Sequence, residues 1–267
     1  MSKVLSFVSI KGGVGKSTLA IETAAALANN FNKKVLLVDA NFSAPNVDLY
    51  LDLTSEVTLH DALLGVGLHN AIYEAHGFDV VLASQNYDEE IDVFRLKKVL
   101  EKMKDRYDYI ILDSSPHHSE LLPVIIASDN VFIVTTPDHV TLTTSLKAAV
   151  LANKNNTVIS GIIINRVRSP RHEESLKDVE KLMGMPVLAK IKEDKKILRA
   201  VNNRTPLILY NCKSSAAKEL IRFSAFLAEE NEKEPGFFEK KLFFSKELPK
   251  ERINRDLARQ GFYEGQL

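Results

Sequence analysis

The chain has 267 residues, with 35 Lys and Arg residues against 35 Asp and Glu residues, and 45% of its residues are apolar. A chain of this length and composition can bury a core, so extensive disorder is excluded. The net charge of zero argues against a protein whose whole surface coats nucleic acid, although it allows a local basic patch. The single cysteine, Cys212, excludes a disulfide framework, a thiolate zinc site and the paired thiolates of an iron–sulfur cluster.

Membrane and export signals are missing from the sequence. The N-terminal residues, MSKVLSFVSIKGG, do not form a signal-peptide pattern. No apolar run approaches the roughly 20 residues of a membrane-spanning helix, and the longest run, at 121–127, contains a proline. We therefore expect a cytoplasmic protein.

Short apolar runs rich in β-branched residues predict seven buried strands, at 4–10, 35–40, 79–84, 109–114, 131–136, 158–165 and 186–191. These runs are continuously apolar, which is typical of a parallel sheet covered on both faces. Helical patterns lie between or after them, at 17–30, 93–104, 143–153, 173–183, 195–203 and 214–230. This alternation predicts an α/β fold with a doubly wound, mostly parallel sheet flanked by helices.

The strongest motif is KGGVGKST, which follows the first predicted strand and opens the first predicted helix. Its glycines let the backbone curl so that successive N–H groups point at phosphate oxygens, and the helix dipole adds positive potential. Lys16 is expected to contact the β- and γ-phosphates, and the Ser17 hydroxyl to ligate Mg²⁺. The motif predicts a site for the phosphates of a nucleotide and for Mg²⁺, with the nucleotide contacted by Gly12, Gly13, Val14, Gly15, Lys16, Ser17 and Thr18.

Two aspartates end predicted strands. Asp113 ends the run YIILD, and Asp39 ends the run VLLVD. Because ligands bind at the carboxyl edge of an open α/β sheet, both carboxylates are expected opposite the phosphate loop. We expect Asp113 to hold Mg²⁺, through water, and Asp39 to be the second acidic member of the Mg²⁺ site.

The phosphate motif departs from the ordinary pattern, because Ile10 stands where a glycine is usual and Lys11 follows it. With this extra lysine, the sequence resembles the deviant Walker A ATPases of the MinD/ParA family of P-loop NTPases. The resemblance covers about residues 1–230 and includes the runs at 35–49, 107–116, 161–167 and 186–208. The PNVDL element and the C-terminal tail make it closer to MinD-like proteins than to plasmid ParA.

The resemblance implies a dimer held together by nucleotide. In that family the first lysine of the motif reaches across the dimer interface, so Lys11 is expected to contact ATP of the other subunit, and loss of the γ-phosphate to weaken the pair. It also implies that Asn165, at the end of GIIIN, reads adenine with an amide that offers both a donor and an acceptor. A strand-ending turn residue is the alternative for Asn165.

Asn41 differs from the family pattern. Relatives usually carry Asp-x-Asp where this chain has Asp39-Ala40-Asn41, and the second Asp is thought to position or activate the attacking water. An asparagine can orient a water but cannot take its proton. We therefore assign Asn41 a catalytic role and expect slow hydrolysis; compensation by another group, such as Asp48 or a partner protein, is the alternative.

The C-terminal part differs in composition. EENEKEPG, near Glu229, is typical of a linker, and six aromatic residues follow within 237–267. We expect an ATPase domain at 1–230 and, at 231–267, a linker with a Phe-rich tail. Residues 237–248 have the composition of an amphipathic membrane anchor, although docking on a partner or on the domain is the alternative.

These observations predict an ATP-dependent dimerising switch that positions a partner or a cellular structure, at the inner face of the membrane or in the cytoplasm. Residues 166–204 hold 11 Lys and Arg against 6 Asp and Glu, so a DNA-associated partition ATPase is an alternative. A solvated helix face explains this excess better, because aromatic residues do not interleave with the charges. A nonhydrolysing ATP-bound scaffold is the remaining alternative, since Asn41 replaces the usual Asp.

Overall fold

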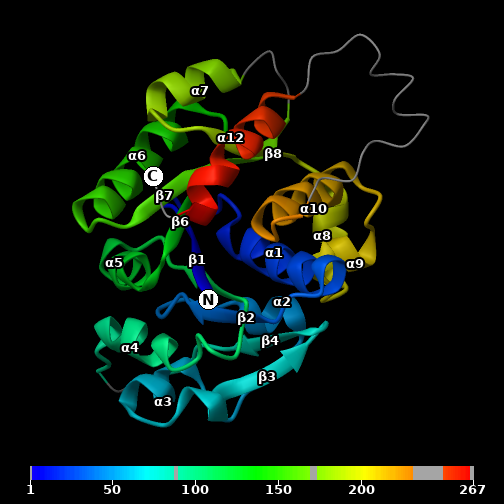
Figure 1. The fold of residues 1–267 in the computed structure, drawn as a ribbon. Coiled ribbons are helices and arrows are strands. Elements are labelled where there is room, and N and C mark those ends of the chain that lie inside the picture. The colour runs from blue at the N-terminus through cyan, green and yellow to red at the C-terminus, as the bar shows by residue number, and fades with distance from the viewer. Residues whose placement is uncertain (1, 87–89, 169–172, 231–248, 265–267) are drawn as a thin grey trace.

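The structure is a computed structural model and describes residues 2–86, 90–168, 173–230 and 249–264 (Figure 1). The described strands are β1 (Lys3–Val8), β2 (Val35–Ala40), β3 (Ile72–Ala75), β4 (Phe78–Val81), β5 (Tyr109–Ser114), β6 (Asn130–Thr135), β7 (Val158–Val167) and β8 (Val187–Lys192). The described α-helices are α1 (Lys16–Phe31), α2 (Val47–Leu51), α3 (Leu59–Leu64), α4 (Leu96–Glu101), α5 (His118–Ala127), α6 (His139–Lys154), α7 (Leu176–Met183), α8 (Lys195–Asn202), α9 (Leu207–Tyr210), α10 (Ser215–Leu227) and α12 (Lys250–Glu264). Two 3₁₀ turns, η1 (Leu68–Ala71) and η2 (Val93–Arg95), complete the described elements.

The strands form one sheet in the order β3-β4-β2-β5-β1-β6-β7-β8. Every neighbouring pair is parallel except β3 with β4. The predicted doubly wound, mostly parallel sheet is therefore confirmed. Because the chain runs to opposite sides of β1 as it winds to β2 and to β6, the carboxyl end of β1 is a switch point of the topology, where such sheets bind ligands.

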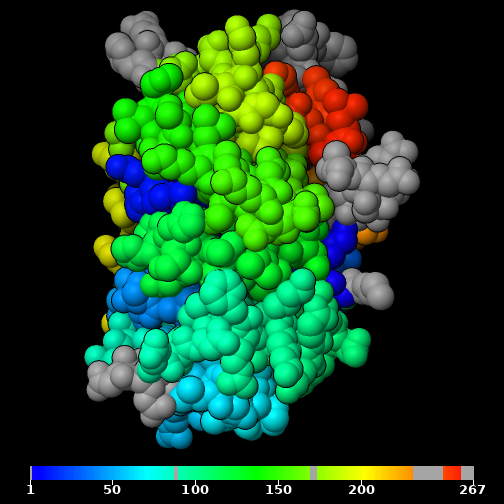
Figure 2. All heavy atoms as spheres, turned by 90° about the vertical axis from the view of Figure 1, so that its left-hand side faces the viewer, coloured from blue at the N-terminus to red at the C-terminus, as the bar shows by residue number. Residues whose placement is uncertain are grey.

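Helices cover both faces of the sheet, and this explains the continuous apolar runs. In β2, Leu37 packs in a cluster with α1 and α10, whereas its neighbours Leu36 and Val38 pack with α3 and α4 on the other face. A third cluster joins β6 and β7 to α5, α6 and α7. Figure 2 shows the face of the molecule that α3 to α7 cover, with α3 in cyan at one end and α7 in yellow-green at the other.

The hairpin of β3 and β4 has no complete counterpart among the predicted strands. β4 overlaps the predicted strand at 79–84, whereas the antiparallel β3 was not expected. β3 has only four residues, of which three are half-buried and one is exposed. A strand this short and this exposed needs no continuous apolar run, so its sequence does not show one. His76 and Gly77, both with positive φ (53° and 85°), make the tight turn between the two strands.

The six predicted helices are present with changed ends, whereas five described helices were not predicted: α2, α3, α5, α9 and α12. α6 begins at His139, because the Asp138 carboxylate accepts the Thr141 N–H and caps the helix. The predicted helix at 93–104 is reduced to η2 and the short α4. The expected helices do not include α5, whose sequence contains Pro123, a residue that disfavours helix interiors.

A buried carboxylate ties the helix that follows the phosphate loop to a distant segment. Glu22 of α1 accepts hydrogen bonds from the backbone N–H groups of Leu207 (2.5 Å) and Ile208 (3.1 Å) at the start of α9. Burial raises the pKa of Glu22 to about 7, and these two hydrogen bonds oppose the shift.

The C-terminal helix α12 packs against β8 and α10 through polar side chains (Figure 1). The Arg255 side chain is 2% exposed and donates to the Leu188 carbonyl (2.5 Å) and to Glu219 (2.9 Å). Asn254 donates to the Val187 carbonyl (2.8 Å), and Lys250 pairs with Glu180. The last strand of the sheet is thus contacted along its side by a helix that the sequence patterns do not predict.

Candidate functional site

The phosphate loop connects β1 to α1 and needs its glycines for conformation. Gly13 and Gly15 have φ values of 76° and 99°, in the region that side chains disfavour. A Cβ atom on Gly15 would lie 2.3 Å from Nδ2 of Asn165. That amide nitrogen donates to the Val14 carbonyl (2.8 Å), so the end of β7 supports the loop from behind.

Lys16 and Asp113 bring opposite charges together at the end of this loop. The Lys16 side chain is buried with 6% exposure, and burial lowers its pKa against the effect of the Asp113 carboxylate. Asp113 is fully buried at the end of β5, and both its oxygens lack a hydrogen-bond partner among the described residues. A buried carboxylate without a hydrogen-bond partner, beside a phosphate loop, is a suitable ligand for a cation or for cation-bound water.

Asp39 ends β2, the strand next to β5, and lies directly opposite Asp113 in the strand register. Burial raises the pKa of Asp39, and the charge of Asp113 raises it further. Burial also raises the pKa of Asp113, while the nearby Ser17 hydroxyl and Lys16 ammonium act in the opposite direction. Two adjacent buried carboxylates repel each other unless a proton or a cation lies between or beside them.

The chemistry of these groups fits Mg²⁺. Asp39, Asp113 and the Ser17 hydroxyl offer oxygen atoms only, which is the donor type that Mg²⁺ prefers. No cluster of three or more His, Cys, Asp or Glu side chains that could hold a metal occurs in the described part of the chain. A cation here would therefore share its coordination with phosphate oxygens and water, as is usual for Mg²⁺ bound with a nucleotide.

The loop after β2 is organised around Asp39. Its carboxylate accepts hydrogen bonds from the backbone N–H groups of Asn41, Asn46 and Val47, each at 3.1 Å. The Asn41 side chain donates through Nδ2 to the Ala44 carbonyl. Its Oδ1 is buried and has no hydrogen-bond partner among the residues described. The amide is thus fixed with its acceptor oxygen unused.

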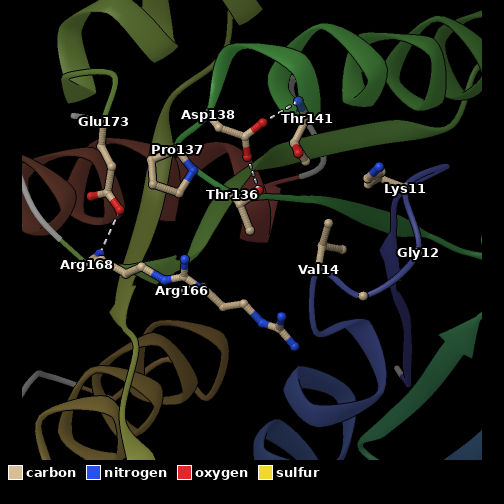
Figure 3. Close-up of a pocket in the computed structure, with 11 residues that line it drawn as sticks. Lys11, Gly12, Val14, Thr136, Pro137, Asp138, Thr141, Arg166, Arg168 and Glu173 are labelled. Carbon is tan, nitrogen blue, oxygen red and sulfur yellow. Dashed lines mark hydrogen bonds between the residues drawn. The ribbon is translucent and has the colours of Figure 1, made fainter.

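A cavity of about 600 Å³ opens beside the phosphate loop (Figure 3). Its lining residues come from the loop, from the segment after β6 with the start of α6, from the end of β7 and from the segment before α7: Lys11, Gly12, Gly13, Val14, Thr136, Pro137, Asp138, Thr141, Arg166, Arg168 and Glu173. Lys11 is exposed, in contrast to the buried Lys16. Within the described ranges, no acidic side chain forms an ion pair with Lys11.

The predicted residues therefore fall into two groups. Lys16 and Ser17 begin α1, directly after the phosphate loop, and lie with Asp39, Asn41 and Asp113 at the carboxyl edge of the central strands. Lys11 faces the open cavity, and Asn165 contacts the back of the loop.

The sequence analysis does not single out the residues of the cavity wall at 136–138, and it gives no role to Arg166, although Arg166 lies in the run at 161–167. These residues follow predicted strands, which marks them as candidates for the site. The sequence does not give the strand order, however, and only that order shows that β6 and β7 end beside the loop.

A doubly wound sheet with a glycine-rich phosphate loop after its first strand, and with acidic residues at the ends of the neighbouring strands, defines a P-loop nucleotide-binding protein. Residues 5–207 match the CobQ/CobB/MinD/ParA nucleotide binding domain. The chain belongs to this family, whose MinD/ParA members are P-loop ATPases.

Individual relatives agree with this assignment. An uncharacterised ATP-binding protein of Methanocaldococcus jannaschii is 30% identical over 85% of this chain and 88% of its own length. The cell division ATPase MinD of Pyrococcus furiosus superposes with a TM-score of 0.81 at 27% identity, covering 86% of this chain and 99% of that one. The septum site-determining protein MinD of Pyrococcus horikoshii, complexed with Mg-ADP, gives a TM-score of 0.80 at 27% identity, covering 85% and 96%.

Proposed function

We propose that this protein is an ATP-dependent molecular switch, which dimerises around bound ATP, hydrolyses it slowly and thereby positions a partner protein or a cellular structure. The observation that carries the proposal is the orphaned, buried Asp113 carboxylate beside Lys16, at the end of a loop in which Gly13 and Gly15 have positive φ. The buried carboxylate favours binding of a cation, and the N–H groups of the loop favour binding of an anion. Mg²⁺ together with a nucleoside triphosphate supplies both.

Each residue of the site has a proposed role in binding. The amides of 12–18 and the Lys16 ammonium bind phosphate oxygens, while Ser17, Asp39 and Asp113 hold Mg²⁺, which neutralises phosphate charge when bound. Asn165 reads adenine with Oδ1 and the second hydrogen of Nδ2, because its first is donated to Val14.

Asn41 makes hydrolysis slow in this proposal. Its Nδ2 is held by the Ala44 carbonyl, so the unpartnered Oδ1 can accept a hydrogen bond from a water and orient it. A neutral amide cannot take the proton of that water. Positioning without a base supports turnover that is slow rather than absent, because phosphoryl transfer depends mainly on positioning and electrostatics. The same residue supports the second candidate function, a scaffold that binds ATP without hydrolysing it.

The proposed dimer depends on a contact made by Lys11. This lysine is exposed at the mouth of the cavity and has no carboxylate partner among the described residues, so its ammonium is available to a phosphate from outside the subunit. We propose that it contacts the nucleotide of the second subunit. The bound triphosphate then links the subunits, and loss of the γ-phosphate releases them.

The surface on which the switch acts, a membrane, a partner protein or DNA, is proposed from the sequence. The candidate membrane segment at 237–248 lies outside the described residues, and no helix that is described is long and apolar enough to cross a membrane. We propose an ATPase domain at 1–230 on which α12 also packs, and a segment at 237–248 that acts at a membrane surface or on a partner protein. DNA association is the less favoured alternative.

Size-exclusion chromatography with light scattering tests the switch. The protein is measured without nucleotide, with Mg-ADP and with Mg-ATP, together with the variant Lys11→Ala. We expect a dimer with ATP only, and its loss in Lys11→Ala at ATP concentrations that still saturate the variant. A wild-type protein that stays monomeric when saturated with ATP would contradict the switch.

A further inference from the structure

Arg166 has an unusual backbone conformation at the carboxyl end of β7. Its φ of 55° lies in the left-handed region, which costs energy for a residue with a side chain. The pairing of β7 with β8 shifts register between Ile164 and Val167, so Arg166 lies within an irregularity of the strand. Such irregularities change the direction of a side chain and recur beside active sites.

The guanidinium of Arg166 forms no close ion pair with a described residue, although its charge adds to the hydrogen bonds from Arg168 in lowering the pKa of Glu193. Arg168, two residues further on, donates through Nε (2.7 Å) and Nη2 (2.9 Å) to Glu193. Arg166 forms no ion pair with any residue that the structure describes. The strain therefore presents a cation that is free to bind a ligand.

The free cation lies in the cavity beside the phosphate loop. Figure 3 shows the Arg166 side chain extending across the cavity toward Val14. The Asp138 carboxylate in the same cavity is already engaged, since it accepts the Thr136 hydroxyl (2.6 Å) and the Thr141 N–H (2.9 Å).

Glu173, the other carboxylate that lines the cavity, accepts the Arg168 N–H (2.7 Å). Neither carboxylate forms an ion pair with Arg166, so its guanidinium is available to an anion.

We infer that Arg166 is a nucleotide-binding residue, whose guanidinium makes an ionic contact with a phosphate group of the nucleotide bound to the phosphate loop of the same subunit. This inference rests on the proposed function. The five N–H donors of a guanidinium match phosphate oxygens, and such charge-assisted hydrogen bonds are stronger than neutral ones. The contact would offset the backbone strain that positions Arg166.

Titration calorimetry with Mg-ADP tests the inference, because ADP lacks the γ-phosphate on which the dimer depends. We expect Arg166→Gln to weaken ADP binding about ten-fold or more, and Arg166→Lys, which keeps the charge, to recover part of the loss. Arg168→Gln is the matched control, since it removes an equal charge that Glu193 already neutralises; it should change the affinity less than about three-fold.

The variant Arg166→Gly separates binding from folding. Glycine adopts positive φ without strain, so this variant should unfold at a temperature no lower than that of the wild type and still bind ADP weakly.

Several outcomes would overturn the inference: wild-type ADP affinity in Arg166→Gln, equal losses in the Gln and Lys variants, or a defect confined to ATP-driven dimerisation, which would place the contact on the partner's nucleotide. Failure of the wild type to bind ADP would instead overturn the proposed function.

Discussion

The side-chain amide of Asn41 determines whether the site can accept a proton from the attacking water. Its backbone N–H and the neighbouring amides are held by Asp39, and its side-chain nitrogen is held by Ala44. The loop therefore fixes the amide in place, and what it lacks is a group that accepts a proton. An aspartate at this position has the same shape and adds that capacity.

We expect Asn41→Asp to raise the rate of ATP hydrolysis several-fold, because a positioned general base contributes to the transfer of the water proton. Steady-state phosphate release at saturating Mg-ATP measures the effect. Asn46→Asp is the matched control, since it places a carboxylate on the same loop, where the Asn46 N–H is also bound to Asp39. An equal gain in both variants, or a decrease in Asn41→Asp, would contradict the assigned role of Asn41.

At the scale of residues, the sequence predicts the groups whose chemistry is written in a short motif or at a strand end. Lys16, Ser17 and Asp113 belong to this class. Arg166 does not, because nothing in the sequence shows that its backbone is left-handed or that Glu193 pairs with Arg168 instead. Such properties depend on strand register and on which neighbouring charges are already matched.

At the scale of elements, the buried strands are predicted well because both faces of each strand are covered by helices. The exceptions have local causes. β3 is a short edge strand in a hairpin, and α5 contains Pro123. α12 is missed because it attaches through polar side chains, while its apolar residues Ile253 and Leu257 are 42% and 74% exposed. A hydrophobic pattern cannot reveal a helix that docks by its polar face.

The attachment of α12 depends on Arg255. We expect Arg255→Met to lower the free energy of unfolding by about 3 kcal/mol, because Glu219 would keep a buried charge without its closest partner. Chemical denaturation measures this loss, and hydrogen exchange should show faster exchange in 250–259.

Arg222→Met is the control for α12. Arg222 pairs with the same Glu219 at 3.6 Å, but its side chain is 42% exposed, so its loss should cost less than about 1 kcal/mol. Equal effects of the two substitutions would show that Arg255 does not anchor the helix.

At the scale of the whole molecule, buried carboxylates couple stability to ligand binding. Burial raises the pKa of Glu22 to about 7, and burial also raises the pKa values of Asp39 and Asp113. Between the unfolded pKa values, near 4, and these raised values, the folded protein binds more protons than the unfolded chain. The contribution of these three groups to the stability of the unliganded protein therefore falls as the pH rises through this interval.

We expect the unliganded protein to lose stability between pH 5 and 8, by roughly 3 kcal/mol from Glu22 alone. Mg-ADP should act in the opposite direction, since a cation binds the ionised pair Asp39 and Asp113, so the thermal shift on adding it should be larger at pH 8 than at pH 6. Thermal unfolding at both pH values measures this. A shift independent of pH, or one unchanged in Asp113→Asn, would contradict a cation site at these carboxylates.

The helix that follows the Phe-rich stretch in the chain, α12, packs on β8, and this affects how the stretch can be removed in an experiment. Glu230 and Pro249 belong to segments that pack on the ATPase domain, so residues 231–248 lie between two segments of the chain that are held by that domain. Cutting the chain after α10 would also strip the helix from the last strand and expose a sheet edge prone to self-association. The clean way to delete the stretch is to substitute a neutral linker of equal length and leave the closing helix in place.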